Sequence, residues 1–172
     1  MADETHPGSS EGNGSHLPQV SVLAQYVKDL SFENPSAPGI YQQQQEQPQV
    51  DVQFNIGTAV VGDNVHEVTL KIEVSAKIAD QPAFQVELSY AGVFGLMNVP
   101  EDQLQPFLLA EAPRILFPFA RSVLANAVRD GNFAALMLEP IDFHGLYMRQ
   151  QAQIAQGIPH GTLDIPGPIG QG

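Results

Sequence analysis

The chain contains no cysteine, so it forms neither disulfide bonds nor thiolate metal sites. Basic residues are also few: 7 lysines and arginines stand against 19 aspartates and glutamates, and the formal net charge is −12. Proteins that bind nucleic acid contact its phosphates through clustered Lys and Arg, so this charge balance argues against nucleic acid as a partner. A charged partner of this chain is expected to be basic.

Two further absences concern targeting. The first basic residue is Lys28, so the N-terminus lacks the positively charged region of a secretory signal. No apolar run approaches the roughly 18 residues that a membrane span needs. We therefore predict a cytoplasmic protein that is not inserted into a membrane.

Catalytic and metal-binding motifs are missing as well. The five histidines form neither an HxH nor an HExxH pair, and His66 is interpreted as a strand-end residue. There is no G-x-S-x-G elbow, and the glycines at 92 and 95 do not belong to a phosphate loop. Acid pairs such as Glu67 and Glu73 are expected on a solvated face, where nothing separates their pKa values. We predict no enzyme, no cofactor and no metal.

The 172 residues are enough for one domain with a buried core and two tails. Residues 1–18 are rich in Gly and Ser, and residues 157–172 are rich in Pro and Gly. Such segments cannot bury enough apolar area to offset the entropy lost on ordering, so both are predicted to be disordered. The ordered domain is predicted to span residues 19–156.

The segment Val65–Ala79 has the clearest alternation in the chain. Its even positions are mostly apolar and its odd positions mostly polar, which predicts a long strand with one buried and one solvated face. Strands of this kind are typical of antiparallel sheets covered on one side. The even positions are His66, Val68, Leu70, Ile72, Val74, Ala76 and Ile78.

Three more segments alternate: Val20–Phe32, Val50–Val60 and Phe84–Tyr90. In the first, the apolar set includes Ala24 and Tyr26, Lys28 interrupts it, and Leu23 and Val27 break the polar set. Turns at residues 62–64 and 80–82 separate the last three strands. These features predict a four-stranded antiparallel sheet.

Residues after Gly95 have helical periodicity. One helix is expected to begin at the acidic turn after Pro100 and to break at Ala112-Pro113. The longest helix is then expected over Pro113–Asp130, with Gly131 as its C′ residue. A last helix is predicted with Asp142 as N-cap. Its apolar face is Phe143, Leu146, Tyr147 and Ile154.

The long helix carries apolar residues over more than half of its circumference, with its three arginines on the remaining side. A helix that covers only one sheet needs a narrower apolar stripe. Either the C-terminal segment of the same chain covers the second side, or another copy does. We favour another copy and therefore predict an oligomer.

The polar face of the predicted sheet is acidic. The odd positions of the four strands add up to −4, six acids less two lysines. Such a face either serves solubility alone or docks a basic partner through complementary potential. Its acids are Asp29, Glu33, Asp51, Glu67, Glu73 and Glu87, and its lysines are Lys71 and Lys77.

Several stretches resemble the motifs of one family. The segment Tyr26–Pro38, YVKDLSFENPSAP, resembles the first-strand signature of the SecB family of protein-export chaperones, and Ile115–Arg121, ILFPFAR, resembles a later motif. The shorter motifs Ala83-Phe84, Gly92-Val93-Phe94, Gly131-Asn132-Phe133 and Pro140–Phe143 complete the series. The resemblance covers roughly residues 19–150.

The resemblance implies an α+β fold, with helices packed on one face of the antiparallel sheet, and a cytoplasmic homotetramer built as a dimer of dimers. It also implies an ATP-independent chaperone, or holdase, without a metal. Such a chaperone binds unfolded preproteins, keeps them translocation-competent and delivers them to the SecA ATPase.

Site residues follow from the same resemblance. The family's SecA-docking acids match Asp29, Glu33 and Glu87, whereas an apolar family contact corresponds to Gln85. The family's client groove matches Val50, Val52, Phe54 and Tyr147. After Met148 the apolar and aromatic family pattern is replaced by Arg149-Gln150-Gln151. The rival hypothesis is an α+β carrier that encloses a small ligand between sheet and helices.

Overall fold

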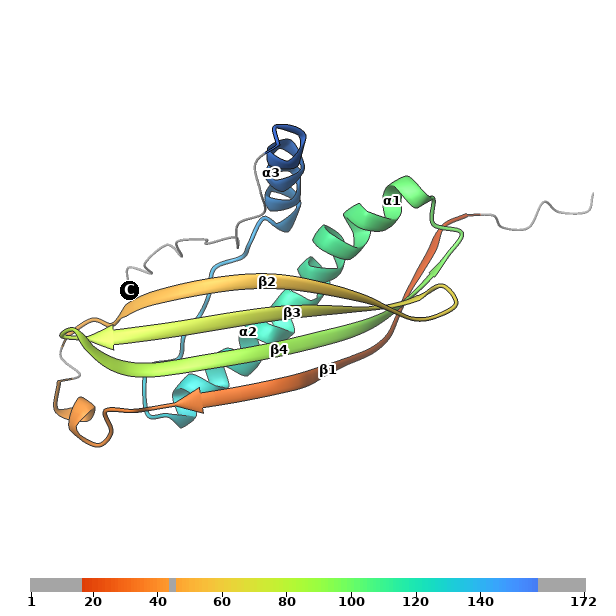
Figure 1. Cartoon of the computed structure of the whole chain (residues 1–172). Coiled ribbons are helices and arrows are strands. Elements are labelled where there is room, and N and C mark those ends of the chain that lie inside the picture. The colour runs from red at the N-terminus through yellow and green to blue at the C-terminus, as the bar shows by residue number, and fades with distance from the viewer. Residues whose placement is uncertain (1–16, 44–45, 158–172) are drawn as a thin grey trace, which may run out of the picture.

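The computed structural model describes residues 17–43 and 46–157. The predicted tails lie outside the described residues except at 17, 18 and 157. The described chain forms one four-stranded antiparallel sheet in the order β1-β4-β3-β2, with β1 and β2 at its edges (Figure 1). The strands are β1 (Gln19–Glu33), β2 (Gln49–Gly62), β3 (Val65–Ile78) and β4 (Gln81–Met97).

Strand β3 has the predicted alternation and lies between β2 and β4. Val68, Leu70 and Ile72 have no exposed surface, whereas the odd-numbered residues between them are half-buried. Burial of one face only follows from the period of two in the sequence. The turn predicted at 62–64 joins β2 and β3 into a hairpin, and Asn64 adopts a left-handed conformation there.

Strand β1 pairs with β4 through two irregularities, at Leu23 and Lys28, each of which is an extra residue without a partner in the register. An extra residue in one strand inverts the alternation of the side chains that follow it. The prediction that one alternation runs through β1 is therefore wrong between the two bulges. There, Ala24 and Tyr26 share a face with the polar residues of β4, and Gln25 and Val27 share the opposite face.

The helical region is continuous from α1 (Glu101–Pro106) through η2 (Phe107–Glu111) to α2 (Ala112–Asp130). The predicted break at Ala112-Pro113 is wrong, because η2 is a π-helical turn. A proline lacks an N–H donor, and its ring clashes with the carbonyl four residues earlier in a regular helix. The wider π turn directly before Pro113 accommodates both effects.

Gly131 ends α2 as predicted, but for a different reason. Its φ is −76°, so it is not the left-handed C′ residue that we expected, and Asn132 has the positive φ instead. A Cβ at residue 131 would lie 2.2 Å from Cζ of Phe32 on β1. Glycine is needed here because the helix end approaches the sheet closely.

The connection from β1 to β2 contains the short 3-10 helix η1 (Gly39–Gln43), which is fixed to the end of α2. The hydroxyl of Tyr41 donates to the carbonyl of Gly131 at 3.0 Å and accepts from the amide of Asn34 at 2.6 Å. The side chain of Ile40 is fully buried. The predicted crossing loop is thus anchored at its base to the helical layer.

The last helix, α3 (Phe143–Ala155), begins where predicted, and the Asp142 carboxylate accepts from the backbone amide of Gly145 at 2.9 Å. Phe143 and Leu146 are buried as expected. The prediction for Ile154 is wrong, since it is exposed. Helix α3 rests on η2 and stands away from the sheet, and most of its second half is exposed (Figure 1).

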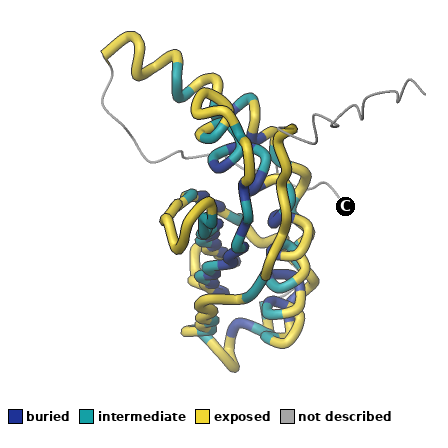
Figure 2. Tube along the Cα trace, turned by 90° about the vertical axis from the view of Figure 1, so that its right-hand side faces the viewer, coloured by how far each residue is buried: buried dark blue, intermediate teal, exposed yellow. Residues whose placement is uncertain are grey.

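The molecule has two layers, because α2 crosses one face of the sheet and leaves the other uncovered (Figure 1). Buried residues gather where the two layers meet (Figure 2). Leu116, Leu124 and Val128 of α2 have no exposed surface there. The predicted fold class, an α+β fold with helices on one face of a four-stranded antiparallel sheet, is confirmed.

Candidate docking face and client-binding surface

The sheet face without helices is called the open face, and it carries the odd-numbered residues of β3 and β4. The register brings the three predicted docking acids together at the β1 edge of this face. Asp29 and Glu33 flank Ser31 on β1, and Ser31 pairs with Glu87 on β4. Glu87 in turn pairs with Glu73 on β3, which extends the acidic surface toward the middle of the sheet.

The charge predicted for this face needs one correction. Lys28 also reaches the open face, because its ammonium group contacts Glu67 on β3. The sum is therefore −3, six acids less three lysines, rather than −4. The bulge explains the difference, since an alternation without a bulge places Lys28 on the other face.

Glu67 is the most heavily engaged acid of the open face. One of its oxygens accepts from the ammonium group of Lys28 at 2.6 Å, and the other accepts from the hydroxyl of Tyr26. The Glu67 side chain is only 15% exposed, and the hydrogen bonds from Lys28 and Tyr26 lower the pKa of its carboxyl group. The same bond to Glu67 raises the pKa of Tyr26. Sequence reasoning missed this cluster, although the interruption of the alternation at Lys28 signals it.

A second lysine pairs with a more exposed acid. The ammonium group of Lys71 lies 2.7 Å from Glu73, and these side chains are 45% and 41% exposed. The hydrogen bond to Glu73 raises the pKa of Lys71, and Glu87 and Asp29 add to this effect. Within the described residues, neither of these two acids, nor Glu33, forms an ion pair. The docking acids thus have no ion-pair partner among the described residues, although Lys71 lies near enough to Glu87 and Asp29 to interact with them electrostatically.

The residues predicted for the client groove lie on the helix-covered side. Val52 and Phe54 belong to the core, where the ring of Phe54 lies 6.3 Å from that of Phe117 on α2. Val50 and Tyr147 are half-buried. The two half-buried residues are accessible in part, but a client reaches the two core residues only if the covering helices move.

Exposed apolar side chains gather on strand β1. Four of them share the face that the helices cover elsewhere, yet each is 43–46% exposed. The end of α2 approaches β1 at Phe32, near the end of the strand. Phe119 on α2 is also exposed, at 51%. An apolar row of this kind along a free sheet edge marks a surface for another protein chain. The β1 residues are Val20, Val22, Val27 and Leu30.

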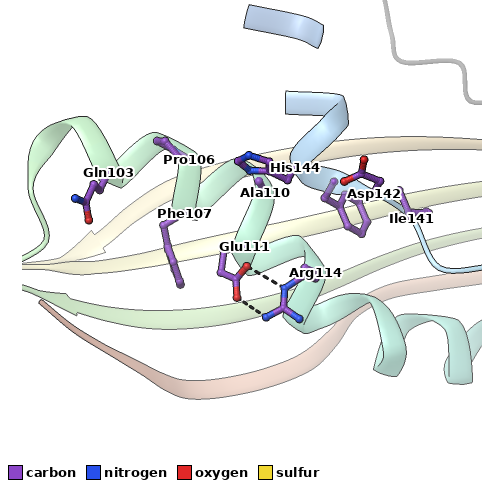
Figure 3. A pocket seen from close by; sticks show the side chains of 10 residues that line it. Gln103, Pro106, Phe107, Ala110, Glu111, Arg114, Ile141, Asp142 and His144 are labelled. Carbon is purple, nitrogen blue, oxygen red and sulfur yellow. Dashed lines mark hydrogen bonds and ion pairs between the residues drawn. The ribbon is translucent and has the colours of Figure 1, made fainter. Parts of the chain in front are cut away.

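A concavity of about 410 Å³ lies between η2 and the start of α3 (Figure 3). Its lining includes Phe107 and Phe143 together with Glu111 and Arg114, and the guanidinium group of Arg114 donates twice to the Glu111 carboxylate. The hydrogen bonds from Arg114 lower the pKa of Glu111, and His144 adds to this effect. The i,i+3 spacing of Glu111 and Arg114 is the only signal for this site in the sequence.

Within residues 17–43 and 46–157, no group of three or more His, Asp or Glu side chains is placed to hold a metal ion. His66 pairs with Phe94 at the start of β3, as expected for a strand-end residue. No helix in the described part of the chain is long and apolar enough to cross a membrane.

Comparisons with known proteins agree with the motifs. The model of the family described as preprotein translocase subunit SecB matches residues 13–154. The chain is 61% identical over 165 residues to the protein-export protein SecB of Rhizorhabdus wittichii, covering 94% of this chain and 99% of that protein. It is 61% identical over 145 residues to the protein-export protein SecB of Zymomonas mobilis, and the match covers 84% of this chain and 88% of that protein.

A solved structure has the same fold. It is a SecB-like chaperone of Mycobacterium tuberculosis in complex with a peptide from an antitoxin. The TM-score is 0.60, with coverage of 71% of this chain and 90% of that one. At 13% identity, the likeness concerns the fold alone.

Proposed function

Since the chain belongs to the SecB family, which is a family of chaperones and not of enzymes, we propose that it is an ATP-independent holdase for protein export. It binds unfolded preproteins in the cytoplasm, keeps them translocation-competent and delivers them to the SecA ATPase. The observation that carries the proposal is the match of the family over nearly the whole domain, at high identity to protein-export proteins.

Client binding draws on apolar surface near β2 and α3. The half-buried Val50 and Tyr147 supply the accessible part of the groove, with Val52 and Phe54 beneath. Helix α3 is the element best able to give way, since only Phe143 and Leu146 of its side chains are buried. Movement of a lightly packed helix costs little free energy, and many weak apolar contacts then hold an extended chain without reading its sequence.

Docking of SecA is assigned to Asp29, Glu33 and Glu87. Their grouping at one edge of the open face, without ion pairs among the described residues, supports this assignment. A flat acidic surface attracts a basic partner and orients it during encounter. Client groove and docking face lie on opposite sides of the sheet, so both partners can be bound together.

Assembly as a homotetramer, a dimer of dimers, is supported by two surfaces. The free edge of β1 has a row of exposed valines and can pair with the same strand of a second copy. The exposed Phe119 lies on the outer side of α2. The segment after α2 covers only part of this helix, where Arg121 donates to the carbonyl of Leu138 at 3.1 Å. A second copy would cover the remainder.

The test separates the two surfaces. A variant with Asp29→Lys and Glu87→Lys is expected to lose SecA affinity by roughly tenfold or more, since it reverses two charges of the docking face. It should still suppress aggregation of a slowly folding preprotein without ATP. The matched control, Asp63→Lys with Glu139→Lys, changes the charge equally at exposed positions outside the open face.

Two outcomes would contradict the proposal. Failure of the unmodified protein to suppress aggregation without ATP would remove the holdase function. Unchanged SecA binding in the variant, with the expected aggregation suppression, would remove the docking assignment alone. Native mass spectrometry of the protein with a denatured preprotein provides the second readout: a monomer with a bound small molecule would favour a carrier instead.

A further inference from the structure

We propose that Glu67 is a positioning residue of the docking face, because it holds Lys28 and thereby keeps the neighbouring docking acid Asp29 available to a basic partner. This inference rests on the proposed docking function. It assigns a role to a residue outside the docking acids and to the bulge in β1.

The bulge at Lys28 places a cation on the open face, next to a docking acid. Val27 pairs with Tyr90 on the helix-covered side, and Asp29 pairs with Ser89 on the open side. The extra residue between them, Lys28, sends its ammonium group to the open face as well. Lys28 directly precedes Asp29 in the chain. If its ammonium group had no other partner, it would compete with the basic groups of a docking protein for the Asp29 carboxylate.

The geometry of Glu67 suits it to hold this cation. Lys28 reaches over β4 to β3, a span of two strand spacings, and its Nζ lies 2.6 Å from Glu67. The hydroxyl of Tyr26 occupies the second oxygen of the same carboxylate and so fixes its orientation. Between β1 and β3, strand β4 contributes the small residue Ala91 opposite Tyr26, which leaves room for both side chains to cross.

Glu67 and Glu73 differ in burial and in the donors that they accept from, although their lysines are similarly exposed, at 51% and 45%. The Glu73 side chain is 41% exposed and receives one lysine, whereas Glu67 is 15% exposed and receives two donors. Exposed ion pairs exchange readily with solvent, and their partners are rarely kept in one place. A carboxylate that accepts from two donors, and is itself largely buried, keeps its lysine in one place more firmly than an exposed carboxylate with one donor.

Removal of the Glu67 charge is therefore expected to weaken docking in two ways. It removes one negative charge from the open face and releases a lysine beside Asp29. The separation of Lys28 and Asp29, which are adjacent in sequence, is well below the Debye length of about 10 Å at 0.1 M salt, so the released cation weakens the local potential. The effect should be largest at low salt.

The experiment measures SecA affinity by titration at low and at high salt for the full chain. Glu67→Gln is expected to weaken binding roughly three- to tenfold at low salt, and less at high salt. Asp51→Asn is the matched control, because it removes one acid of the same face from the opposite edge strand without releasing a lysine, and its expected change is below about twofold. Adding Lys28→Met to Glu67→Gln should restore affinity, since the charge sum is then that of the unmodified face.

A merely structural role would not give this rescue. The positioning role is wrong if Glu67→Gln weakens SecA binding no more than Asp51→Asn does. It is also wrong if adding Lys28→Met to Glu67→Gln fails to restore the affinity. Lys28→Met alone provides a test that does not depend on folding of the glutamine variant. Because Glu67 already holds this lysine in the unmodified protein, affinity should change by less than about twofold, and a larger change in either direction contradicts the proposal. Failure of the docking function itself is distinguishable, because Asp29→Asn and Glu87→Gln would then leave affinity unchanged in the same titration.

Discussion

At the scale of single residues, Glu67 links the pH dependence of stability to the docking face. Its pKa in the folded protein is lowered by Lys28 and Tyr26, so its contribution to stability is present above its unfolded pKa of about 4.5 and is lost as the pH falls through the lower folded value. Glu67→Gln is therefore expected to lower the melting temperature at pH 7 by roughly 2 to 4 °C. The difference from the unmodified protein should shrink as the pH falls through this lowered folded value.

Melting curves between pH 3 and pH 8 check this expectation. Glu73→Gln serves as the control, because the more exposed Lys71–Glu73 pair contributes little to stability and should show almost no pH-dependent difference. A deficit of Glu67→Gln that stays constant down to pH 3 would mean that the effect comes from packing and not from the charge of Glu67.

Gly131 is the residue at which helix and sheet come closest. A Cβ there would lie 2.2 Å from Cζ of Phe32 and 2.7 Å from Cε1, so the ring must move. Gly131→Ala is expected to lower the free energy of unfolding by about 1–3 kcal/mol, which is the usual cost of inserting an extra group into a packed site. Gly39→Ala is the control, since a Cβ at residue 39 meets nothing within 4 Å. Equal stability of the two variants in urea titrations would contradict the close approach.

At the scale of elements, periodicity predicted β3 almost completely and most of β2, but only the central part Phe84–Tyr90 of β4, which spans Gln81–Met97. Strand β4 pairs with β3 through an irregularity near its start, so the alternation does not run through its whole length. The covered face of β3, such as Leu70 and Ile72, could be read directly from the sequence. Strand β1 could not, because bulges at Leu23 and Lys28 shift the phase, and a bulge depends on pairing with β4. The continuous helix was missed for a similar reason: Pro113 predicts a break unless a π turn precedes it.

Helix α3 has few packing contacts and depends on its N-cap. The Asp142 carboxylate accepts from the amide of Gly145 at 2.9 Å, and loss of such a cap costs about 1 kcal/mol. Asp142→Ala is expected to increase hydrogen exchange of the α3 amides severalfold and to leave β3 and β4 unchanged, since α3 can unfold locally. Asp130→Ala is the control, because an acid at the end of α2 stabilises nothing there. Unchanged exchange in α3 would show that packing alone holds it.

At the scale of the whole molecule, alternation predicted that one sheet face is acidic and open, and the resemblance supplied the docking acids. Neither could predict that Lys28 joins Lys71 and Lys77 on that face, because Lys28 reaches Glu67 across β4 only through the bulge. The burial of Val52 and Phe54 also depends on the three-dimensional position of α2 relative to β2. Local patterns thus specify layers and faces, whereas contacts between distant strands and helices need the fold.

The last prediction concerns assembly through the edge of β1. Val22 and Val27 face the helix-covered side, yet each is 44% exposed, and a second copy paired at this edge would bury them. Val22→Glu with Val27→Glu should therefore produce a smaller assembly in sedimentation at micromolar concentration, because burying two charges without partners costs several kcal/mol. Val60→Glu with Val61→Glu is the control, since these valines are more exposed, at 74% and 55%, and lie on β2 at the opposite edge. An unchanged mass of the β1 variant would exclude β1 as the pairing edge, and a smaller mass of the control would move the interface to β2.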